Sequence, residues 1–537
     1  MTTLLRSTVH LATDWQLTAC GQHADPWSAL APVALLTAPD GTSRRVPLFW
    51  NGGQAWIARV VVDAPGTWHL HSICTEDIGL HDQRAEFIVS PVSEPEVNPL
   101  LKHGPIRIDG ARFVHHDGTP FSWLGDTWWM LLSDRVRFPD DFTRLVDYRA
   151  AQGFTVVQLV VGFPPDITPF DGRDGNEGGT PWEPGYARIN PGYFEAVDAR
   201  LRTLIACGIV PCLMGSWGYH LLFMGAERMA AHWRYLVARY AAWPVIWSLA
   251  GEGAMPFYLS TDKAGDSERL RQAWPAITKQ VRATDPWRRP LTLHPRSASW
   301  DDTLAPELLD FHMLQCGHMP QSPQFGVDLL ATGMGRYPTL PIVQGEPPYE
   351  GHGGTNGPDT QRWCYWSTML GGAAGYTYGA AGIFQANDRA RPTGFRPDGG
   401  AFDRQTWDES LVLPGAQQVA MAHRLLIELG FAHCTPHPEW LHVDLQWGRE
   451  HYHPPFQTFA AGIAGELVIG YIPLRWYHWD GALISGLTPG NRYRAWYLDP
   501  EVFTRHEHGE IVADAQGQWR GPTFPYMHDW VVIIQRV

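Results

Sequence analysis

Two short stretches carry the strongest signal for the fold: Val245-Ile246-Trp247-Ser248-Leu249-Ala250-Gly251-Glu252 and Pro341-Ile342-Val343-Gln344-Gly345-Glu346. Each is an apolar run of strand length that ends in Gly-Glu. From Gly104 onward such runs alternate with amphipathic helices, which is typical of βα units around a parallel sheet. The two stretches therefore predict two strands of one parallel sheet, each followed by an acidic side chain.

The pattern contains eight such strands, with ends near Gly125, Val161, Gly215, Ala250, His294, Gln315, Gln344 and Tyr378. Helices are expected at residues 139–152, 191–207, 226–242, 266–284 and 360–371, and a closing helix at 413–429. Eight strands with intervening helices predict a (β/α)8 barrel, the TIM-barrel architecture.

The two ends of the chain read differently from the middle. Short alternating runs separated by Gly, Pro and Asp turns occur before residue 91 and again after residue 431. The polar, Pro-marked segment 92–99 suits a linker. We therefore expect a multidomain protein of α/β and all-β parts: an N-terminal β-sandwich (1–93), a catalytic barrel (94–432) and a C-terminal β-sandwich (433–537).

Composition narrows the choice of ligand. At 537 residues the chain is long enough for two or three hydrophobic cores. Its net charge of −14 is spread along the sequence without a basic cluster, which argues against nucleic acid as a partner. The 26 Trp residues have flat apolar faces that can stack on sugar rings, although large cores also use Trp. We therefore expect a carbohydrate ligand.

Location is predicted from the N-terminus and the cysteines. Residues 1–21 hold no continuous apolar stretch, so neither a secretory signal nor a membrane anchor is expected. The seven cysteines are scattered and lack CxxC spacing, which is typical of reduced thiols. These features predict a cytoplasmic protein that does not associate with membranes. The sequence does not indicate an oligomeric state.

The chemistry is expected where the barrel strands end, because active sites of such barrels lie at the C-terminal ends of the strands. Glu252 follows the fourth predicted strand and Glu346 the seventh. Retaining glycosidases use two carboxyl groups about 5 to 5.5 Å apart. We expect Glu252 to be the general acid/base, with a raised pKa, and Glu346 to be the ionised nucleophile. The alternative for either residue is a helix cap or an ion pair.

Further candidates for substrate binding follow other strands. Asp126 could accept hydrogen bonds from sugar hydroxyls, and its neighbours Trp128 and Trp129 could stack on the ring. Asp126 could instead cap the following helix. Trp217, after the third strand, is expected either to form an aromatic wall or to pack in the core.

Polar residues after later strands face the same predicted mouth. His294 follows the fifth strand, and Gln315 and His318 follow the sixth. A neutral His could orient the nucleophile, bind a sugar hydroxyl or have only a structural role. Tyr349 and Tyr378 are expected to offer phenols to Glu346 or to the ring oxygen of the sugar.

Other chemistries have weaker support. Glu350 is a rival nucleophile, but it lies in the loop four positions after Glu346 at the strand end. The 24 His residues include no HExxH spacing, so no metal is expected. The chain also lacks a Walker loop and a GxSxG elbow, so we expect no cofactor and no serine nucleophile.

These residues also resemble a known family. The segments concerned are 117–127, 153–158, Gly251-Glu252, Gln315-Cys316-Gly317-His318, Gln344-Gly345-Glu346-Pro347 and Gly375-Tyr376-Thr377-Tyr378-Gly379. They resemble the bacterial barrels called apiosidase-like, also known as the domain of unknown function 4038 type, which include the apiosidases of glycoside hydrolase family 140. The likeness spans residues 102–429 and implies a glycoside hydrolase.

The flanking regions extend this resemblance. Phe49-Trp50-Asn51-Gly52-Gly53 looks like the β-sandwich that commonly precedes such barrels, and the end of the chain is similar to the β-domain named after collagen binding. That name does not imply collagen as a ligand here. Relatives often carry Asp where this chain has Glu252, so the resemblance does not transfer the substrate.

The sequence thus predicts a retaining exo-glycosidase that removes one terminal sugar, such as apiose or another pentofuranose, by double displacement. Two alternatives stay open. One is an endo-acting or hexose-specific hydrolase of the wider clan A, which would release other products. The other is a carbohydrate-binding barrel without catalysis, which the presence of both carboxyl groups disfavours.

Overall fold

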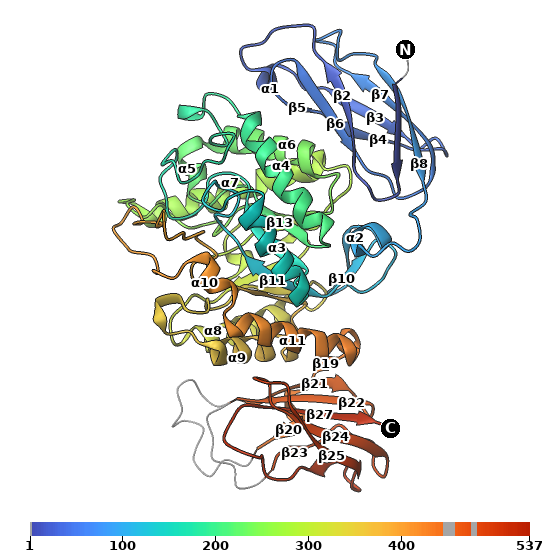
Figure 1. The fold of residues 1–537 in the computed structure, drawn as a ribbon, viewed down its shortest axis with the longest axis vertical. Coiled ribbons are helices and arrows are strands. Elements are labelled where there is room, and N and C mark those ends of the chain that lie inside the picture. Colours follow the sequence, from blue (N-terminus) through green and yellow to red (C-terminus); the bar gives the residue numbers. More distant parts are fainter. Residues whose placement is uncertain (1–2, 444–456, 474–480) are drawn as a thin grey trace.

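The computed structural model describes residues 3–443, 457–473 and 481–537. Figure 1 shows an elongated molecule with a β-rich region at each end and a barrel between them. The expected combination of a TIM barrel with flanking β regions is confirmed. The expected boundaries at residues 93 and 432 stay predictions; the last N-terminal strand, β8 (Arg84–Ser90), and the first C-terminal one, β19 (Thr435–Pro436), lie close to them.

Eight parallel strands form the barrel: β11 (Trp123–Thr127), β12 (Val156–Val160), β13 (Val210–Met214), β14 (Ile246–Ser248), β15 (Leu291–Thr292), β16 (His312–Gln315), β17 (Ile342–Glu346) and β18 (Gly375–Tyr378). Their spatial order is β15-β14-β13-β12-β11-β18-β17-β16. The first and last strands in this order, β15 and β16, are connected by an isolated hydrogen bond. The backbone N–H of Asp310, just before β16, donates to the carbonyl of Leu291 in β15 at 2.9 Å. The carboxyl ends of all eight strands therefore surround one mouth.

Helices cover the outside of the barrel: α3 (Asp140–Gln152), α4 (Pro191–Ala206), α6 (Ala226–Tyr240), α7 (Lys263–Thr284), α8 (Ser322–Arg336), α9 (Pro358–Leu370) and α11 (Pro414–Glu428). All except α8 were expected from the sequence. Helix α8 contains Gly326, Gly333 and Gly335, and glycine disfavours a helix when its propensity is read alone. Tertiary packing overrides that preference, because a Cβ on Gly333 would lie 2.7 Å from Ile342 of β17.

A hairpin closes the end of the barrel opposite the mouth. It consists of β9 (Ile106–Asp109) and β10 (Arg112–His115). Phe113 of β10 packs on Trp123 at the start of β11 and on Phe311 before β16, with ring centroids 5.2 Å apart in both pairs. The N-terminal ends of the strands are thus sealed by aromatic packing, which leaves the carboxyl ends for function.

The N-terminal region consists of two sheets, with strand orders β1-β8-β7-β3-β4 and β2-β6-β5. Arg59 of β6 (Ala55–Val60) anchors it to the barrel, because its buried guanidinium bonds to Asp14 at 2.7 Å and to Asp198 of α4 at 3.0 Å. Arg239 of α6 binds the same Asp198 at 2.8 Å. Arg59, Asp198 and Arg239 are all buried, so the two regions share a paired charge network.

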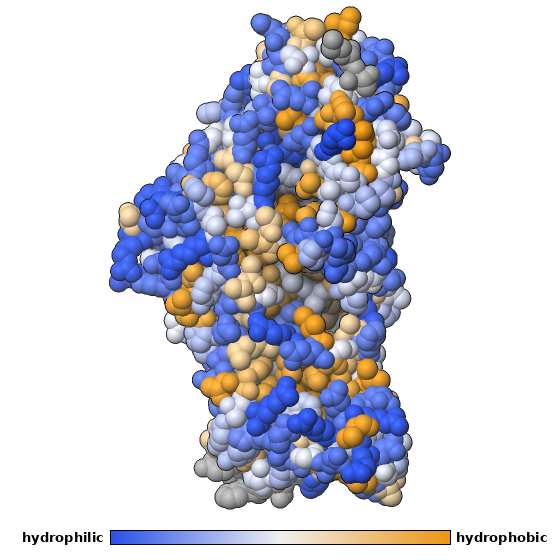
Figure 2. Space-filling view, turned by 45° about the vertical axis from the view of Figure 1, so that its right-hand side comes forward, coloured by the Kyte–Doolittle hydropathy of each residue, from blue (hydrophilic) through white to orange (hydrophobic). Residues whose placement is uncertain are grey.

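The C-terminal region also has two sheets, with orders β19-β21-β22-β27-β24-β25 and β20-β23-β26. It packs on α9 of the barrel. Arg362 of α9 pairs with Asp529 at 2.8 Å, and Trp366 stacks on Tyr471 with centroids 6.0 Å apart. On the face seen in Figure 2, hydrophobic residues occur in small groups among hydrophilic ones. No helix among the described residues is long and apolar enough to span a membrane.

Candidate active site

Glu252 lies at the barrel mouth in an unusual backbone conformation. It follows β14 by four residues, and its φ of 43° is left-handed, which is uncommon for a residue with a Cβ. The preceding Gly251 is required by close packing, since a Cβ there would lie 2.1 Å from the ring of Trp217. Strain of this kind concentrates at functional sites. The Gly-Glu motif therefore holds the carboxyl group beside Trp217.

Two side chains donate hydrogen bonds to Glu252. Gln315 Nε2 binds Oε1 at 2.8 Å, and Trp217 Nε1 binds Oε2 at 3.3 Å. Burial raises the pKa of Glu252 to about 8, and the nearby charge of Glu346 acts in the same direction. Glu252 is therefore protonated at neutral pH, as a general acid must be before the reaction.

Glu346 ends β17 and has a different environment. His318 Nε2 hydrogen-bonds to its Oε1 at 3.2 Å, and His294 Nε2 lies 3.3 Å from its Oε2, although not in line for a hydrogen bond. The backbone N–H of Tyr349 donates to His318 Nδ1 at 3.2 Å, which leaves Nε2 to carry the ring proton. Burial alone would raise the pKa of Glu346, but the two histidines lower it to about 2. Glu346 is therefore ionised.

The two carboxyl groups are neighbours across the mouth. Gln315, which binds Glu252, stands opposite Glu346 in the ladder between β16 and β17. Trp129 extends the same group, because its Nε1 donates to the Tyr349 hydroxyl at 2.9 Å. Its ring packs edge-on against Trp217, with centroids 5.3 Å apart. The protonated Glu252 and the ionised Glu346 are thus surrounded by the same set of aromatic and polar side chains.

The structure places the expected residues in two groups. It brings Glu252 and Glu346 together with Trp129, Trp217, His294, Gln315, His318 and Tyr349. It gives Asp126, Trp128 and Tyr378 other partners.

Asp126 points away from this group. Its carboxylate pairs with Arg149 of α3 at 2.6 Å and accepts from Trp128 Nε1 at 2.8 Å, and Asp126 and Arg149 are both completely buried. The ring of Trp128 packs on Phe142 of α3. Asp126 and Trp128 thus tie strand β11 to helix α3, and these contacts place them outside the group around Glu252 and Glu346.

Tyr378 and the rival carboxyl Glu350 form a separate pair. The Tyr378 hydroxyl donates to Glu350 Oε2 at 2.6 Å, and the backbone N–H of Gly415 donates to Oε1 at 3.0 Å. Both oxygens of Glu350 are therefore occupied at the start of α11. Among the two expected phenols, only Tyr349 contacts the group around Glu346.

The sequence analysis missed Asp166 and Tyr258. Asp166 lies in the loop after β12, and it accepts a hydrogen bond from the Tyr258 hydroxyl. The available signal was an acidic residue after an apolar strand, as for Glu252, but the segment Phe163-Pro164-Pro165 separates Asp166 from the strand.

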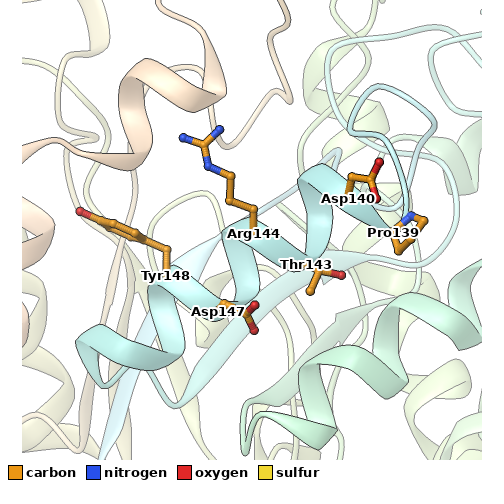
Figure 3. A pocket seen from close by; sticks show the side chains of 6 residues that line it. All are labelled: Pro139, Asp140, Thr143, Arg144, Asp147 and Tyr148. Carbon is orange, nitrogen blue, oxygen red and sulfur yellow. The ribbon is translucent and has the colours of Figure 1, made fainter.

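Other sites are distinct from this one. A shallow hollow of about 780 Å³ runs along α3 and is lined by Pro139, Asp140, Thr143, Arg144, Asp147 and Tyr148, all from one helix or its N-terminal end (Figure 3). None of these residues belongs to the carboxyl pair. Within the described parts of the chain, no three His, Cys, Asp or Glu side chains are grouped so that they could hold a metal ion.

A parallel eight-stranded barrel with carboxyl groups at the ends of its fourth and seventh strands is typical of glycoside hydrolases, and the family match assigns the chain to that class. Residues 108–433 match the family described as "Apiosidase-like, catalytic domain", well over half of the chain. The protein therefore belongs to the apiosidase-like family, and the resemblance noted in the sequence is confirmed.

Solved structures show the same fold. A protein named as a glycoside hydrolase is 20% identical with a TM-score of 0.65, over 82% of this chain and 98% of its own. A glycoside hydrolase family 5 protein from Bacteroides vulgatus ATCC 8482 is 20% identical with a TM-score of 0.66, over 83% and 96%. A third structure, from the same strain, is 18% identical with a TM-score of 0.68, over 99% and 100%. No curated protein matches the sequence.

Proposed function

We propose that the protein is a retaining exo-glycosidase that releases one terminal sugar, apiose or another pentofuranose, with Glu346 as nucleophile and Glu252 as general acid/base. The observation that carries this proposal is the contrast between the surroundings of two neighbouring carboxyl groups: Glu252 is buried against Gln315 and Trp217, which raises its pKa to about 8, whereas His318 and His294 lie against Glu346 and lower its pKa to about 2. Paired groups with separated pKa values are the mark of acid and base assignments.

The proposed reaction proceeds in two displacements. The Glu346 carboxylate attacks the anomeric carbon while the bond to the leaving oxygen breaks, and that oxygen takes the proton of Glu252. The resulting glycosyl ester on Glu346 is then attacked by water, which gives a proton to the Glu252 carboxylate. The sugar leaves with its original anomeric configuration, and both carboxyl groups return to their starting states.

Two features support small, terminal substrates. Glu346 is only 4% exposed, and it is surrounded by Trp129, His294 and Tyr349, which are each 2% exposed or less. A carboxylate this deep suits a single sugar unit better than the interior of a polymer. Membership of the apiosidase-like family makes apiose the leading candidate for that unit.

The test is hydrolysis of a panel of aryl glycosides and apiose-bearing glycosides by wild type, Glu252→Gln and Glu346→Gln. Glu350→Gln is the matched control, because it removes a buried carboxylate that pairs with Tyr378. We expect release of one sugar by wild type and by Glu350→Gln, and its loss in the other two variants. Activity that survives in both Glu252→Gln and Glu346→Gln would refute the assignment.

Product analysis separates the proposal from its rivals. Proton NMR during hydrolysis should show the product first in the anomeric form of the substrate, whereas an inverting enzyme would give the opposite anomer. Release of oligosaccharides from a polymer would favour an endo-acting enzyme, and release of hexoses would favour a hexose-specific one. Binding of sugars without any turnover would favour a non-catalytic barrel.

A further inference from the structure

A third carboxyl group, that of Asp166, lies near Glu252 and Glu346 but has no role in the two proposed displacements. Asp166 lies in the loop after β12, and its Oδ1 accepts a hydrogen bond from Tyr258, which follows Glu252 by six residues. Its φ of 65° is left-handed, as at Glu252. Asp enters the left-handed region more readily than most residues with a Cβ, so this φ marks a tight turn of the loop.

The loop that carries Asp166 is braced from the third strand. The Tyr219 hydroxyl donates to the Ile167 carbonyl at 2.7 Å, and its ring lies 5.8 Å from that of Tyr258. Tyr219 is completely buried. The loops after β12, β13 and β14 thus meet around Asp166, on the side of the mouth where Glu252 lies.

Charges around Asp166 connect it to the candidate active site. Burial raises the pKa of Asp166, the charge of Arg396 opposes this, and the charge of Glu346 adds to it. The charge of Asp166 in turn contributes to the raised pKa of Glu252. The Arg396 guanidinium lies over the Tyr258 ring, 5.6 Å from its centroid. Asp166 is therefore within electrostatic reach of both carboxyl groups.

One side of this carboxyl group is unused. The described residues form no hydrogen bond to Asp166 Oδ2, and the side chain is only partly buried. Oδ2 is therefore reachable from solvent, and a ligand that donates a hydrogen bond can take the place of water there. Sugar hydroxyls are such donors, whereas the carboxylate of an acidic sugar would be repelled.

We propose that Asp166 is a substrate-binding residue that accepts a hydrogen bond from a hydroxyl group of a neutral sugar, with Tyr258 as its positioning residue. This inference rests on the proposed function, because the sugar is the one presented to Glu346. It adds a specificity for uncharged sugars over uronic acids.

The experiment uses the 4-nitrophenyl glycoside that wild type hydrolyses fastest, together with its monodeoxy analogues. A hydrogen bond to a charged group corresponds to a loss of about 10- to 100-fold in kcat/KM. We expect Asp166→Ala to show that loss in kcat/KM on the parent glycoside, mostly through a higher KM. On the one analogue that lacks the bound hydroxyl, Asp166→Ala and wild type should have the same kcat/KM. Asp166→Asn and Tyr258→Phe should show smaller losses of the same pattern.

The matched control is Tyr526→Phe, which removes the same kind of bond, from Tyr526 to Asp499, in the C-terminal region. It should leave KM unchanged. Equal losses by Asp166→Ala on every analogue would mean a structural role and overturn the inference, as would unchanged kinetics. If wild type cleaves no glycoside in the panel, both the proposed function and this inference are wrong. If wild type cleaves a glycoside and Asp166→Ala has the same kinetics as wild type, only the inference is wrong.

Discussion

The amide of Gln315 donates a hydrogen bond to Glu252 Oε1 over 2.8 Å, although Gln315 ends β16 and Glu252 lies in the loop after β14. This bond favours the ionised form of Glu252 and so lowers its pKa, against the larger effect of burial. Gln315 thereby sets how tightly the proposed acid holds its proton.

Gln315→Leu should therefore raise the pKa of Glu252. Loss of one hydrogen bond of about 1 kcal/mol corresponds to a shift of roughly one pH unit or less. We expect the basic limb of the kcat/KM profile to move upward. Gln324→Leu is the control and should leave the profile in place, because the Gln324 amide donates to Asp328 of the same helix, α8. A downward shift for Gln315→Leu would contradict this account of the bond.

The wild-type pH profile should itself be asymmetric. Activity requires Glu346 ionised, with a pKa of about 2, and Glu252 protonated, with a pKa of about 8. We expect kcat/KM to be flat through mildly acid and neutral pH and to fall about tenfold per pH unit well above the pKa of Glu252. Initial rates across this range test the expectation, and a fall that begins at mildly acid pH would argue against a protonated Glu252.

Glu252→Gln should stabilise the protein at alkaline pH. Burial raises the pKa of Glu252 from 4.5 to about 8, so the folded state holds a proton that the unfolded state releases. Stability from this group is therefore lost as pH rises between those values. Glutamine does not ionise, so we expect the Tm of the Glu252→Gln variant to exceed that of wild type by roughly 2 °C or more near pH 8. Calorimetry near pH 5 should show a smaller difference; a constant difference would exclude this origin.

Arg149→Met should unfold more easily without a change in specificity. It would leave the completely buried Asp126 charge unpaired, which costs about 3–5 kcal/mol. Denaturant titration and KM measured on the folded protein test this. The double variant Arg149→Met/Asp126→Leu should recover much of the stability, since both charges are gone. A raised KM with normal stability in Asp126→Asn would instead return Asp126 to the sugar site.

Local patterns in the sequence were sufficient to predict the barrel and to single out Glu252 and Glu346 as candidates. Apolar runs that alternate with amphipathic helices specify βα units, and Gly-Glu after such a run places an acid at the mouth. Which other side chains face that mouth depends on contacts between elements that lie far apart in the sequence. Asp126 follows its strand as Glu252 does, yet the buried charge of Arg149, on another element, turns it away from the mouth. Asp166 could not be predicted from the sequence, because its position near Glu252 depends on a loop that is held by the hydrogen bond from Tyr258.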